Sequence, residues 1–381
     1  MKKILFLTVR DPFSGRFSGD VIRSKKFVEY FAKKNNVQVL ALGKNNSLKN
    51  SKRLSVRLFK NENFFIILFR CLISLLRSKP LHLNFFYSSA LKRYLKLNIK
   101  SYDLIFCQSI RSFQYLPEIK KNIILDVGDL YSKNYYQTYK NLFFFNPLKF
   151  IYYIESKLVK KYEQLCFSKS NKILLFSKKE IQEIKNVPKN KKIQINFGID
   201  KIKKIYKFSK TNYKIVFIGN IKYAPNRQAC IKFIKDIFPK IKKLFPNIEF
   251  HILGEIYLID KYFFMKKPGV HLKGKIKNLE PYLSNVICGL ANLNISTGVQ
   301  TKLLTYMSYG IPSICSKKVY ENFDKVKSNK INYYKNDEDL LNLIVKMTKD
   351  SSFCNKISNR SIKTVQNFKW QKVLKTFDSF I

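Results

Sequence analysis

The sequence predicts an α/β protein of two domains, each built around a doubly wound parallel sheet. Each half of the chain opens with a continuous apolar run, Ile4–Val9 and Ile215–Ile218, as expected for a parallel strand covered on both faces. Further apolar runs alternate with amphipathic helical segments along both halves, which is the pattern of doubly wound sheets. At 381 residues, the chain is also too long for one ordinary core.

A glycine-containing loop follows the first predicted strand. It runs from Arg10 to Gly19, contains Gly15, and leads into a helix whose apolar face includes Val21 and Phe31. The loop lacks the G-x-G-x-x-G pattern of dinucleotide-binding folds. It is therefore either a plain strand-to-helix turn or part of a ligand site. Later strands of the first half are expected at 37–42, 104–108, 123–126 and 173–176, and the half ends at 193–196.

Two carboxylates, Asp126 and Asp129, come at the end of a predicted strand in the first half. Ligands of doubly wound sheets bind at the carboxyl ends of the strands, so either carboxylate could meet a ligand hydroxyl. The alternative for Asp129 is that it caps or orders the next turn.

The second half repeats this organisation after a polar, Lys-rich linker at Phe197–Asn212. Gly219 and Asn220 turn the chain after the first strand, and Asn226 is expected to cap the next helix. Strands are expected at 248–253 and 286–290, and helices at 340–347, 357–365 and 370–380.

The most informative stretch is Gly298–Pro312, which predicts a loop, a short helix and a stop. A helix that begins at Thr301 points free N–H groups into the preceding loop, and Lys302 adds a positive charge beside them. Gly310 and Pro312 then end the helix. These features indicate an anion site, whereas an ordinary amphipathic helix with a glycine stop is the alternative.

Two apolar segments of the first half, Phe64–Leu76 and Phe143–Tyr153, have two interpretations. Phe64–Leu76 is interrupted by Arg70 and falls short of the roughly 20 residues of a membrane span. We expect both segments to be buried in the core. The alternative is peripheral contact with an anionic membrane surface, to which the Lys-rich first half would be attracted.

Charge and cysteine usage limit the functional class. The net charge is +48, almost all from Lys spread along the chain, and such a surface attracts nucleic acid, anionic lipid or phosphorylated substrates. No nucleic-acid-binding signature accompanies it, so we expect no specific nucleic-acid partner.

Seven scattered Cys and a short apolar start without a signal peptide favour a cytoplasmic protein. No partner pattern for metal or nucleophilic chemistry surrounds His82, His251 or His271, and we expect all three to be structural.

Five segments together resemble the GT-B glycosyltransferases of family 4, especially the exopolysaccharide-type branch. Gly298–Pro312 is similar to the branch pattern G-x-Q-N-K-x-L-E-A-M-A-x-G-x-P. Each motif alone is weak, but their order and spacing over nearly the whole chain are specific. The other similar segments are Gly19–Ser24, Leu125–Ser132, Tyr213–Asn226, and Gly274–Ile276 with Pro281–Leu283.

The resemblance implies two Rossmann-like domains that face a central cleft. It places an acceptor-side domain at 1–196, a linker at 197–212, a nucleotide-sugar domain at 213–365, and a helix at 366–381 that returns to the first domain. The implied activity is retaining transfer of a sugar from a UDP- or GDP-sugar to a glycan or lipid-linked acceptor in surface polysaccharide synthesis. Neither a bound metal nor another cofactor is implied. The expected location is the cytoplasm, and the alternative interpretation of the two apolar segments adds peripheral contact at the inner face of the cell membrane.

The resemblance also assigns candidate site residues. Asp126 and Asp129 become candidates for a catalytic role at the sugar. Candidates for contact with the acceptor or a phosphate are Gly15, Gly19, Asp20 and Arg23. Candidates for donor binding are Gly219, Asn220, Lys222, Asn226, Gly298, Val299, Gln300, Thr301, Lys302 and Thr305.

Two positions depart from the family pattern. Where the family places a Glu that holds the ribose hydroxyls, this chain has Thr305, and Thr297 replaces a second Glu of many relatives. A hydroxyl makes one such bond where a carboxylate accepts two strong ones. Either donor binding is rearranged or weakened, or catalysis is lost. The alternative function is therefore a non-catalytic basic protein of the same fold that binds membrane or nucleic acid.

Overall fold

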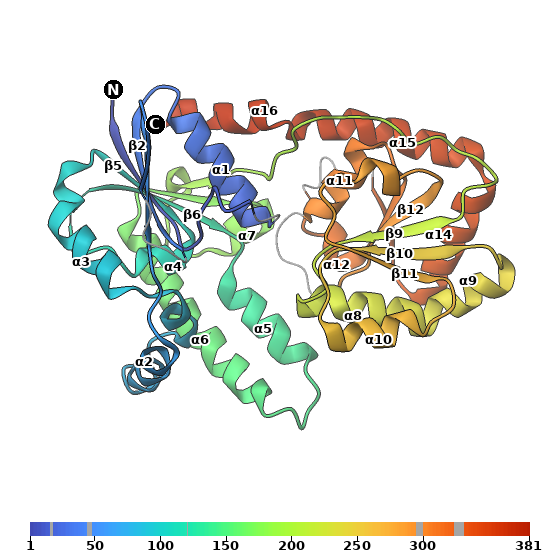
Figure 1. Cartoon of the computed structure of the whole chain (residues 1–381), viewed down its shortest axis with the longest axis horizontal. Helices are drawn as coiled ribbons and strands as arrows, with labels where there is room; N and C mark the ends of the chain where they lie inside the picture. Colours follow the sequence, from blue (N-terminus) through green and yellow to red (C-terminus); the bar gives the residue numbers. More distant parts are fainter. Residues whose placement is uncertain (16–17, 44–47, 120, 295–299, 324–330) are drawn as a thin grey trace. The chain divides into compact units, whose positions relative to one another are not determined.

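A computed structural model describes residues 1–15, 18–43, 48–119, 121–294, 300–323 and 331–381. The described residues form two compact units (Figure 1). The first comprises Met1–Asn196 with Thr376–Ile381, and the second comprises Phe197–Lys375. Each unit contains its own sheet, so the predicted fold class of two doubly wound domains is confirmed.

The sheet of the first unit has the order β3-β4-β2-β1-β5-β6-β7-β8 in the described part of the chain. All neighbours pair in parallel except β3 with β4. The central strands β1, β5 and β6 are almost fully buried because helices cover both faces. The strands are β1 Lys3–Leu7, β2 Asn36–Leu42, β3 Leu48–Ser51, β4 Leu54–Phe59, β5 Leu104–Gln108, β6 Asn122–Gly128, β7 Lys172–Leu175 and β8 Lys192–Gln194.

Helices and 3-10 turns connect these strands. Helix α1 leads from β1 to β2, and the α5–α6 pair leads from β6 to β7 (Figure 1). The elements are α1 Gly19–Phe31, α2 Phe64–Leu76, η1 Leu81–Phe86, α3 Ser89–Asn98, η2 Ile99–Ser101, α4 Ser109–Phe113, α5 Tyr131–Asn141, α6 Leu148–Lys169, α7 Lys178–Glu183 and η3 Lys189–Lys191. Ser177 caps α7 by accepting a hydrogen bond from the Lys179 N–H.

The second unit contains a parallel sheet whose strands have the order β11-β10-β9-β12-β13-β14 among the described residues. Its strands are β9 Lys214–Ile218, β10 Glu249–Leu253, β11 Val270–Gly274, β12 Val286–Ala291, β13 Ser313–Ser316 and β14 Asn332–Tyr334. Its helices are α8 Ala224–Lys232, the π-helical η4 Phe233–Ile237, α9 Phe238–Leu244, α10 Leu258–Met265, η5 Glu280–Tyr282, α11 Thr301–Ser308, α12 Lys317–Tyr320, α14 Asp337–Lys349, α15 Ser351–Val365, η6 Gln366–Phe368 and α16 Trp370–Leu374.

The helix predicted over 370–380 is interrupted. It consists of α16 and a separate 3-10 segment, η7 Lys375–Ser379. Phe377 of that segment is fully buried, with its ring 4.8 Å from Phe27 and 4.9 Å from Phe31 between centroids. We attribute the interruption to this aromatic packing, which fixes the end of the chain on the first unit.

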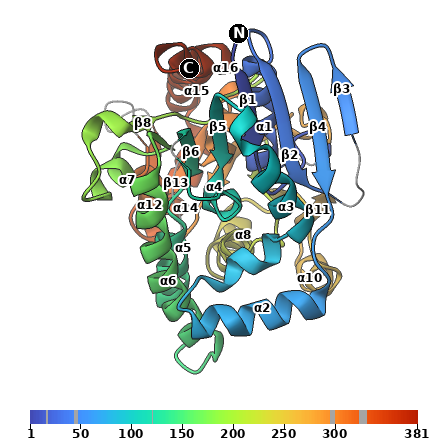
Figure 2. The same cartoon turned by 90° about the vertical axis from the view of Figure 1, so that its left-hand side faces the viewer.

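The expected core burial of the two apolar segments is wrong. In α2, Ser74 is the buried residue, whereas Phe65 is 82% and Leu76 is 88% exposed. At the α5–α6 turn, Phe143, Phe144 and Phe145 are 76–81% exposed. Both segments lie at the lower end of the first unit in Figures 1 and 2.

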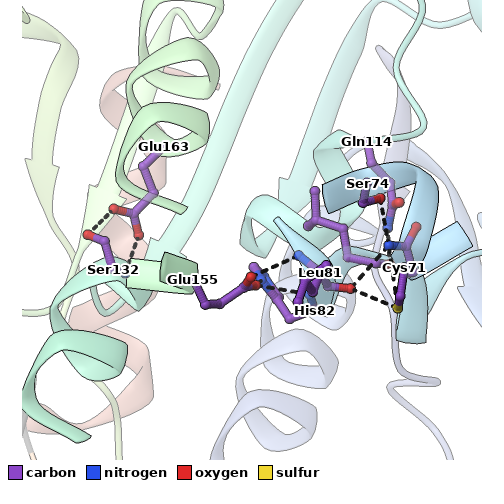
Figure 3. Close-up of polar contacts among 10 residues, drawn as sticks. Cys71, Ser74, Leu81, His82, Gln114, Ser132, Glu155 and Glu163 are labelled. Carbon is purple, nitrogen blue, oxygen red and sulfur yellow. Dashed lines mark hydrogen bonds and ion pairs between the residues drawn. The ribbon is translucent and has the colours of Figure 1, made fainter. Parts of the chain in front are cut away.

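Polar contacts explain why α2 holds its position at the surface (Figure 3). The Leu81 and His82 N–H groups donate to Glu155 of α6 over 2.9 and 3.0 Å, and His82 Nδ1 lies 2.7 Å from the same carboxylate. The Asn84 amide donates to Ser74 of α2 over 2.8 Å. Glu155 thus fixes η1 and, through η1, fixes α2. Buried hydrogen bonds anchor this helix, so its apolar side chains are left facing outward.

Candidate functional site

The donor candidates that the structure describes lie at the carboxyl edge of the second sheet, where two loops meet. The Gly219 N–H, at the end of β9, donates to the Leu253 carbonyl over 2.9 Å. A Cβ on Gly254 would collide with the Gly219 carbonyl oxygen, so only glycine allows this approach of the β9 and β10 loops. The close approach brings Lys222 and Glu255 to the same edge, with 3.4 Å between their charged atoms.

Lys302 and Asn226 meet at this edge although 76 residues separate them. Lys302 Nζ donates to Asn226 Oδ1 over 2.7 Å, and the Asn226 amide donates to the Asn220 carbonyl over 2.8 Å. The Lys302 ammonium also lies 3.9 Å from the centre of the Phe217 ring. Asn226 lies inside the first turn of α8, whose N-cap is Tyr223, so the capping role predicted for Asn226 is wrong. Its side chain instead connects two predicted donor residues.

The environment of Lys302 perturbs its protonation. The side chain is buried, and the loss of hydration lowers the pKa of Lys302 to about 7. Its hydrogen-bond acceptor is a neutral amide rather than a carboxylate, so the amide leaves the positive charge uncompensated. An incoming anion would favour the charged form.

Tyr306 fixes helix α11 against the sheet, a role that no sequence motif indicated. Its hydroxyl accepts a hydrogen bond from the Ile218 N–H over 2.9 Å and reaches the Val216 and Leu290 carbonyls over 3.2 and 3.1 Å. Gly289 provides room for the ring, because a Cβ there would lie 2.5 Å from it. The large Tyr306 ring beside the small Gly289 thereby fixes α11 and positions Lys302, which lies four residues before Tyr306.

Of the other candidate residues at and just before the Gly298–Pro312 stretch, some are described by the structure and some are not. Gln300 is the N-cap of α11, Thr301 is exposed in its first turn, and the hydroxyl of the half-buried Thr305 donates to the Thr301 carbonyl over 3.1 Å. Thr301 and Thr305 therefore lie on one side of the helix, one turn apart. Thr297, Gly298 and Val299 lie outside the described residues.

In the first unit, Arg23 and Asp126 form a buried ion pair. Arg23 Nε and Nη2 each donate to one Asp126 oxygen over 2.8 Å, and both side chains are about 2% exposed. Phe27 and Phe176 cover the guanidinium, with centroids 4.5 and 4.4 Å away. With both carboxylate oxygens committed to Arg23, the geometry gives this pair a structural role. It does not support the catalytic role expected for Asp126 or the acceptor contact expected for Arg23.

Asp129 lies beside a second carboxyl group, that of Glu180, which the sequence analysis did not select. Glu180 is fully buried, and burial followed by the nearby charge of Asp129 raises the pKa of Glu180 to about 9. Asp129 itself is half-buried and follows β6, and the N-cap position of α5 belongs to Leu130. Glu180 thus stays protonated at neutral pH beside the Asp129 side chain.

The predicted acceptor-side glycines flank the first loop. Gly15 has a φ of +69°, and a Cβ added there would have no neighbour within 4 Å among the described residues. Gly19 is the first residue of α1. Asp20 lies in the first turn of α1 and pairs with Arg10 over 2.6 Å at the surface. Beside this loop, Asp20 thus supplies a surface carboxylate and Arg10 a surface guanidinium.

Comparison with solved structures shows the class of fold. The chain is similar over its full length to sucrose-phosphate synthase from Thermosynechococcus elongatus (TM-score 0.75, 12% identity, 98% of that chain). It is also similar to WaaG, a glycosyltransferase involved in lipopolysaccharide biosynthesis (TM-score 0.68, 11% identity, 100% and 99% of the two chains). A third similar structure is HepE from Anabaena in complex with UDP and glucose (TM-score 0.64, 11% identity, 100% and 99%). The fold is therefore GT-B.

Sequence comparison matches part of the chain to a described family. Residues 212–350 match the family described as glycosyl transferases group 1. An uncharacterised 44.6 kDa protein from the cps region of Klebsiella pneumoniae is 29% identical over 176 residues, which are 42% of this chain and 41% of that protein. The match thus spans about two-fifths of the relative's length. The match to group 1 glycosyl transferases thus covers residues 212–350, and the GT-B fold covers the whole chain.

Proposed function

We propose that the protein transfers a sugar from a UDP- or GDP-sugar to a glycan or lipid-linked acceptor, with retention of the anomeric configuration and without a bound divalent metal. The observation that carries this proposal is the Lys302–Asn226–Asn220 chain of hydrogen bonds at the carboxyl edge of the second sheet. HepE binds UDP and glucose, and WaaG acts in lipopolysaccharide biosynthesis. By analogy, the reaction belongs to surface polysaccharide synthesis.

The leaving diphosphate is the group that this site would stabilise. Negative charge develops on it as the bond to the sugar breaks, and fixed cations and N–H groups lower the energy of that charge. Protonated Lys302 and the first-turn N–H groups of α11 supply both. In this proposal, Lys302 Nζ turns from the Asn226 oxygen toward the phosphate, while Lys222, Gln300 and Thr301 contribute at the rim. Asp129 is the candidate carboxylate on the acceptor side.

Direct donor binding tests the proposal. Calorimetric titration with UDP-glucose, UDP-N-acetylglucosamine and GDP-mannose should show one site per chain for one donor, followed by turnover when an acceptor glycan is added. If no donor binds, the alternative is favoured, namely a basic protein that keeps the fold without catalysis. That alternative also expects binding to decline steeply with salt.

Replacing Thr305 by Glu is expected to tighten donor binding. The carboxylate would give the ribose hydroxyls a charged acceptor worth about 1.5–3 kcal/mol, which corresponds to roughly 10–150-fold in Kd. Thr305 is half-buried on the same side of α11 as Thr301, so a longer side chain can extend outward. Calorimetry on both proteins measures the change. Thr305→Gln controls for size, and an unchanged or weaker affinity for Thr305→Glu would mean that the site is rebuilt around a hydroxyl.

We further propose that the first unit docks on the anionic inner face of the cell membrane. Among the described residues, no helix is long and apolar enough to cross a bilayer. Helix α2 and the α5–α6 turn nevertheless expose large apolar side chains on the same end of the unit. Basic side chains border both segments: Arg77 and Lys79 follow α2, the Lys149 ammonium lies near the Phe144 ring of the turn, and the Lys140 ammonium lies near Tyr136 in α5. Each Lys or Arg near such a surface adds about 1 kcal/mol.

Removing the aromatic turn should weaken vesicle binding. The triple variant Phe143→Ser/Phe144→Ser/Phe145→Ser is expected to lose at least about 3 kcal/mol, roughly 100-fold in partitioning, because each buried phenyl ring contributes about 1.5–3 kcal/mol. Co-sedimentation with vesicles of equal parts phosphatidylglycerol and phosphatidylcholine measures this. The control is Leu258→Ser/Ile259→Ser/Tyr262→Ser on α10, which removes equally exposed apolar groups from the second unit. Equal losses in both triple variants, or binding that ignores lipid charge, would contradict the proposal.

A further inference from the structure

A cluster of three potential metal ligands lies on one face of the second sheet. Glu249 and His251 are two residues apart on β10, so both side chains point to the same face. His271 is the register partner of His251 on the neighbouring strand β11. Within the described residues this is the one group of three His, Cys, Asp or Glu side chains close enough to share an ion. No sequence motif revealed it, because only the strand register joins positions 251 and 271.

The distances suit a small tetrahedral cation. Two bonds of about 2.1 Å at the tetrahedral angle place their donor atoms about 3.4 Å apart. Glu249 Oε2 lies 3.4 Å from His271 Nε2 and 2.6 Å from His251 Nε2, and all three ligand atoms lie within 4.8 Å of one another. A bound ion would therefore replace the short Glu249–His251 hydrogen bond with only a small widening. We propose that Glu249, His251 and His271 bind one zinc ion, with water at the fourth position.

The surroundings favour a bound ion that exchanges with solvent. The His251 side chain is only 6% exposed, which fixes its ring, whereas Glu249 and His271 are 32% and 40% exposed and leave a path to water. The opposite face of β10 packs on the aromatic core, where Phe250 lies 4.7 Å from Phe233 between centroids, so the backbone is rigid. Such a site would cross-link the edge strand β11 to β10.

This site is separate from the proposed donor site and does not depend on it. Glu249 begins β10, and Gly254 follows its end. Five residues of extended strand place the two positions roughly 16 Å apart. Zinc binding and donor binding can therefore succeed or fail independently. Lys273, two residues after His271, adds a positive charge near the Glu249 carboxylate that opposes a bound cation.

The three histidines of the chain make a direct test available. In protein labelled selectively at histidine, the imidazole signals of His251 and His271 should shift on addition of one equivalent of zinc sulfate. The signals of His82 should not move, because His82 is buried in the first unit against Glu155. Competition with a chromophoric chelator should give a stoichiometry of one and a higher Tm for the zinc-loaded protein.

Variants decide whether the three residues form the site. His271→Ala, at a partly exposed edge position, should lower zinc affinity at least about 100-fold. The loss of an outer-shell partner costs roughly 10–100-fold, so a larger loss indicates that His271 is a ligand. Glu249→Gln should lower it as well, while Glu338→Gln, an exposed carboxylate on α14, should not. Circular dichroism confirms that each variant is folded. Absence of one-to-one binding, or an unchanged affinity in His271→Ala, would overturn the proposal.

Discussion

Replacing Arg23 by Met should destabilise the first unit by about 3–5 kcal/mol, because it leaves the Asp126 carboxylate buried without its partner. Arg23 also donates to the Ile195 and Asn196 carbonyls over 3.2 and 3.0 Å, so the substitution frees four acceptors at once. Hydrogen exchange of peptides from β1, β5 and β6 measures this loss in the first unit alone.

Two further variants separate charge burial from simple loss of contacts. Arg10→Met removes an arginine from the exposed pair with Asp20 and should cost no more than about 1 kcal/mol. The double variant Arg23→Met/Asp126→Leu should recover much of the stability, because replacing both charges by apolar groups removes the desolvation penalty. An Arg23→Met protein as stable as the Arg10→Met protein would show that the buried pair contributes little to folding.

The second large effect is expected at Lys302. Lys302→Met keeps an unbranched apolar side chain of similar length and removes the charge that lies over the Phe217 ring. If Lys302 stabilises the leaving diphosphate, kcat/KM should fall by about 10²–10³-fold, the range for loss of one preorganised donor. Lys318→Met, at an exposed position of α12, makes the same change in net charge and should leave kcat/KM unaltered. Equal donor affinities in Lys302→Met and the wild type would exclude the residue from the site.

The pH dependence of donor affinity adds a second readout for Lys302. Its pKa of about 7 means that the group is mostly neutral above neutral pH in the free protein. An anionic donor binds the protonated form, so binding takes up a proton, and affinity should fall as pH rises through and above 7, at most about tenfold per unit. Below that pKa the dependence should level off. In Lys302→Met this dependence should disappear, and calorimetry of UDP-glucose binding in buffers of different ionisation enthalpy counts the protons.

The fold was predictable because it depends on local patterns. The runs at Ile4–Val9 and Ile215–Ile218 contain too few polar residues for a half-exposed strand, and they became the central strands β1 and β9. Edge elements were not predicted. The short strands β3 and β14 mix polar and apolar residues, because an edge strand needs less burial, and their pattern resembles that of a loop.

The candidate donor site was partly predictable. Lys302 and Asn226 were selected by motif, and the structure brings them into contact. Their environment could not be predicted, since the burial of Lys302 and its lowered pKa depend on Phe217 from a distant strand. The same limit applies to Glu180, whose fully buried carboxyl group lies beside Asp129 only after β6 and β7 pair.

The sequence by itself determined the central strands of both units and the order of the two sheets along the chain, because hydrophobic period and turn residues act over a few positions. It also predicted an anion site in the stretch around Lys302. Only the tertiary structure decided which polar groups meet. It buried Arg23 with Asp126, turned the apolar face of α2 outward, and aligned His251 with His271. Those outcomes depend on strand register and on buried hydrogen bonds between residues far apart in sequence, which no local pattern encodes.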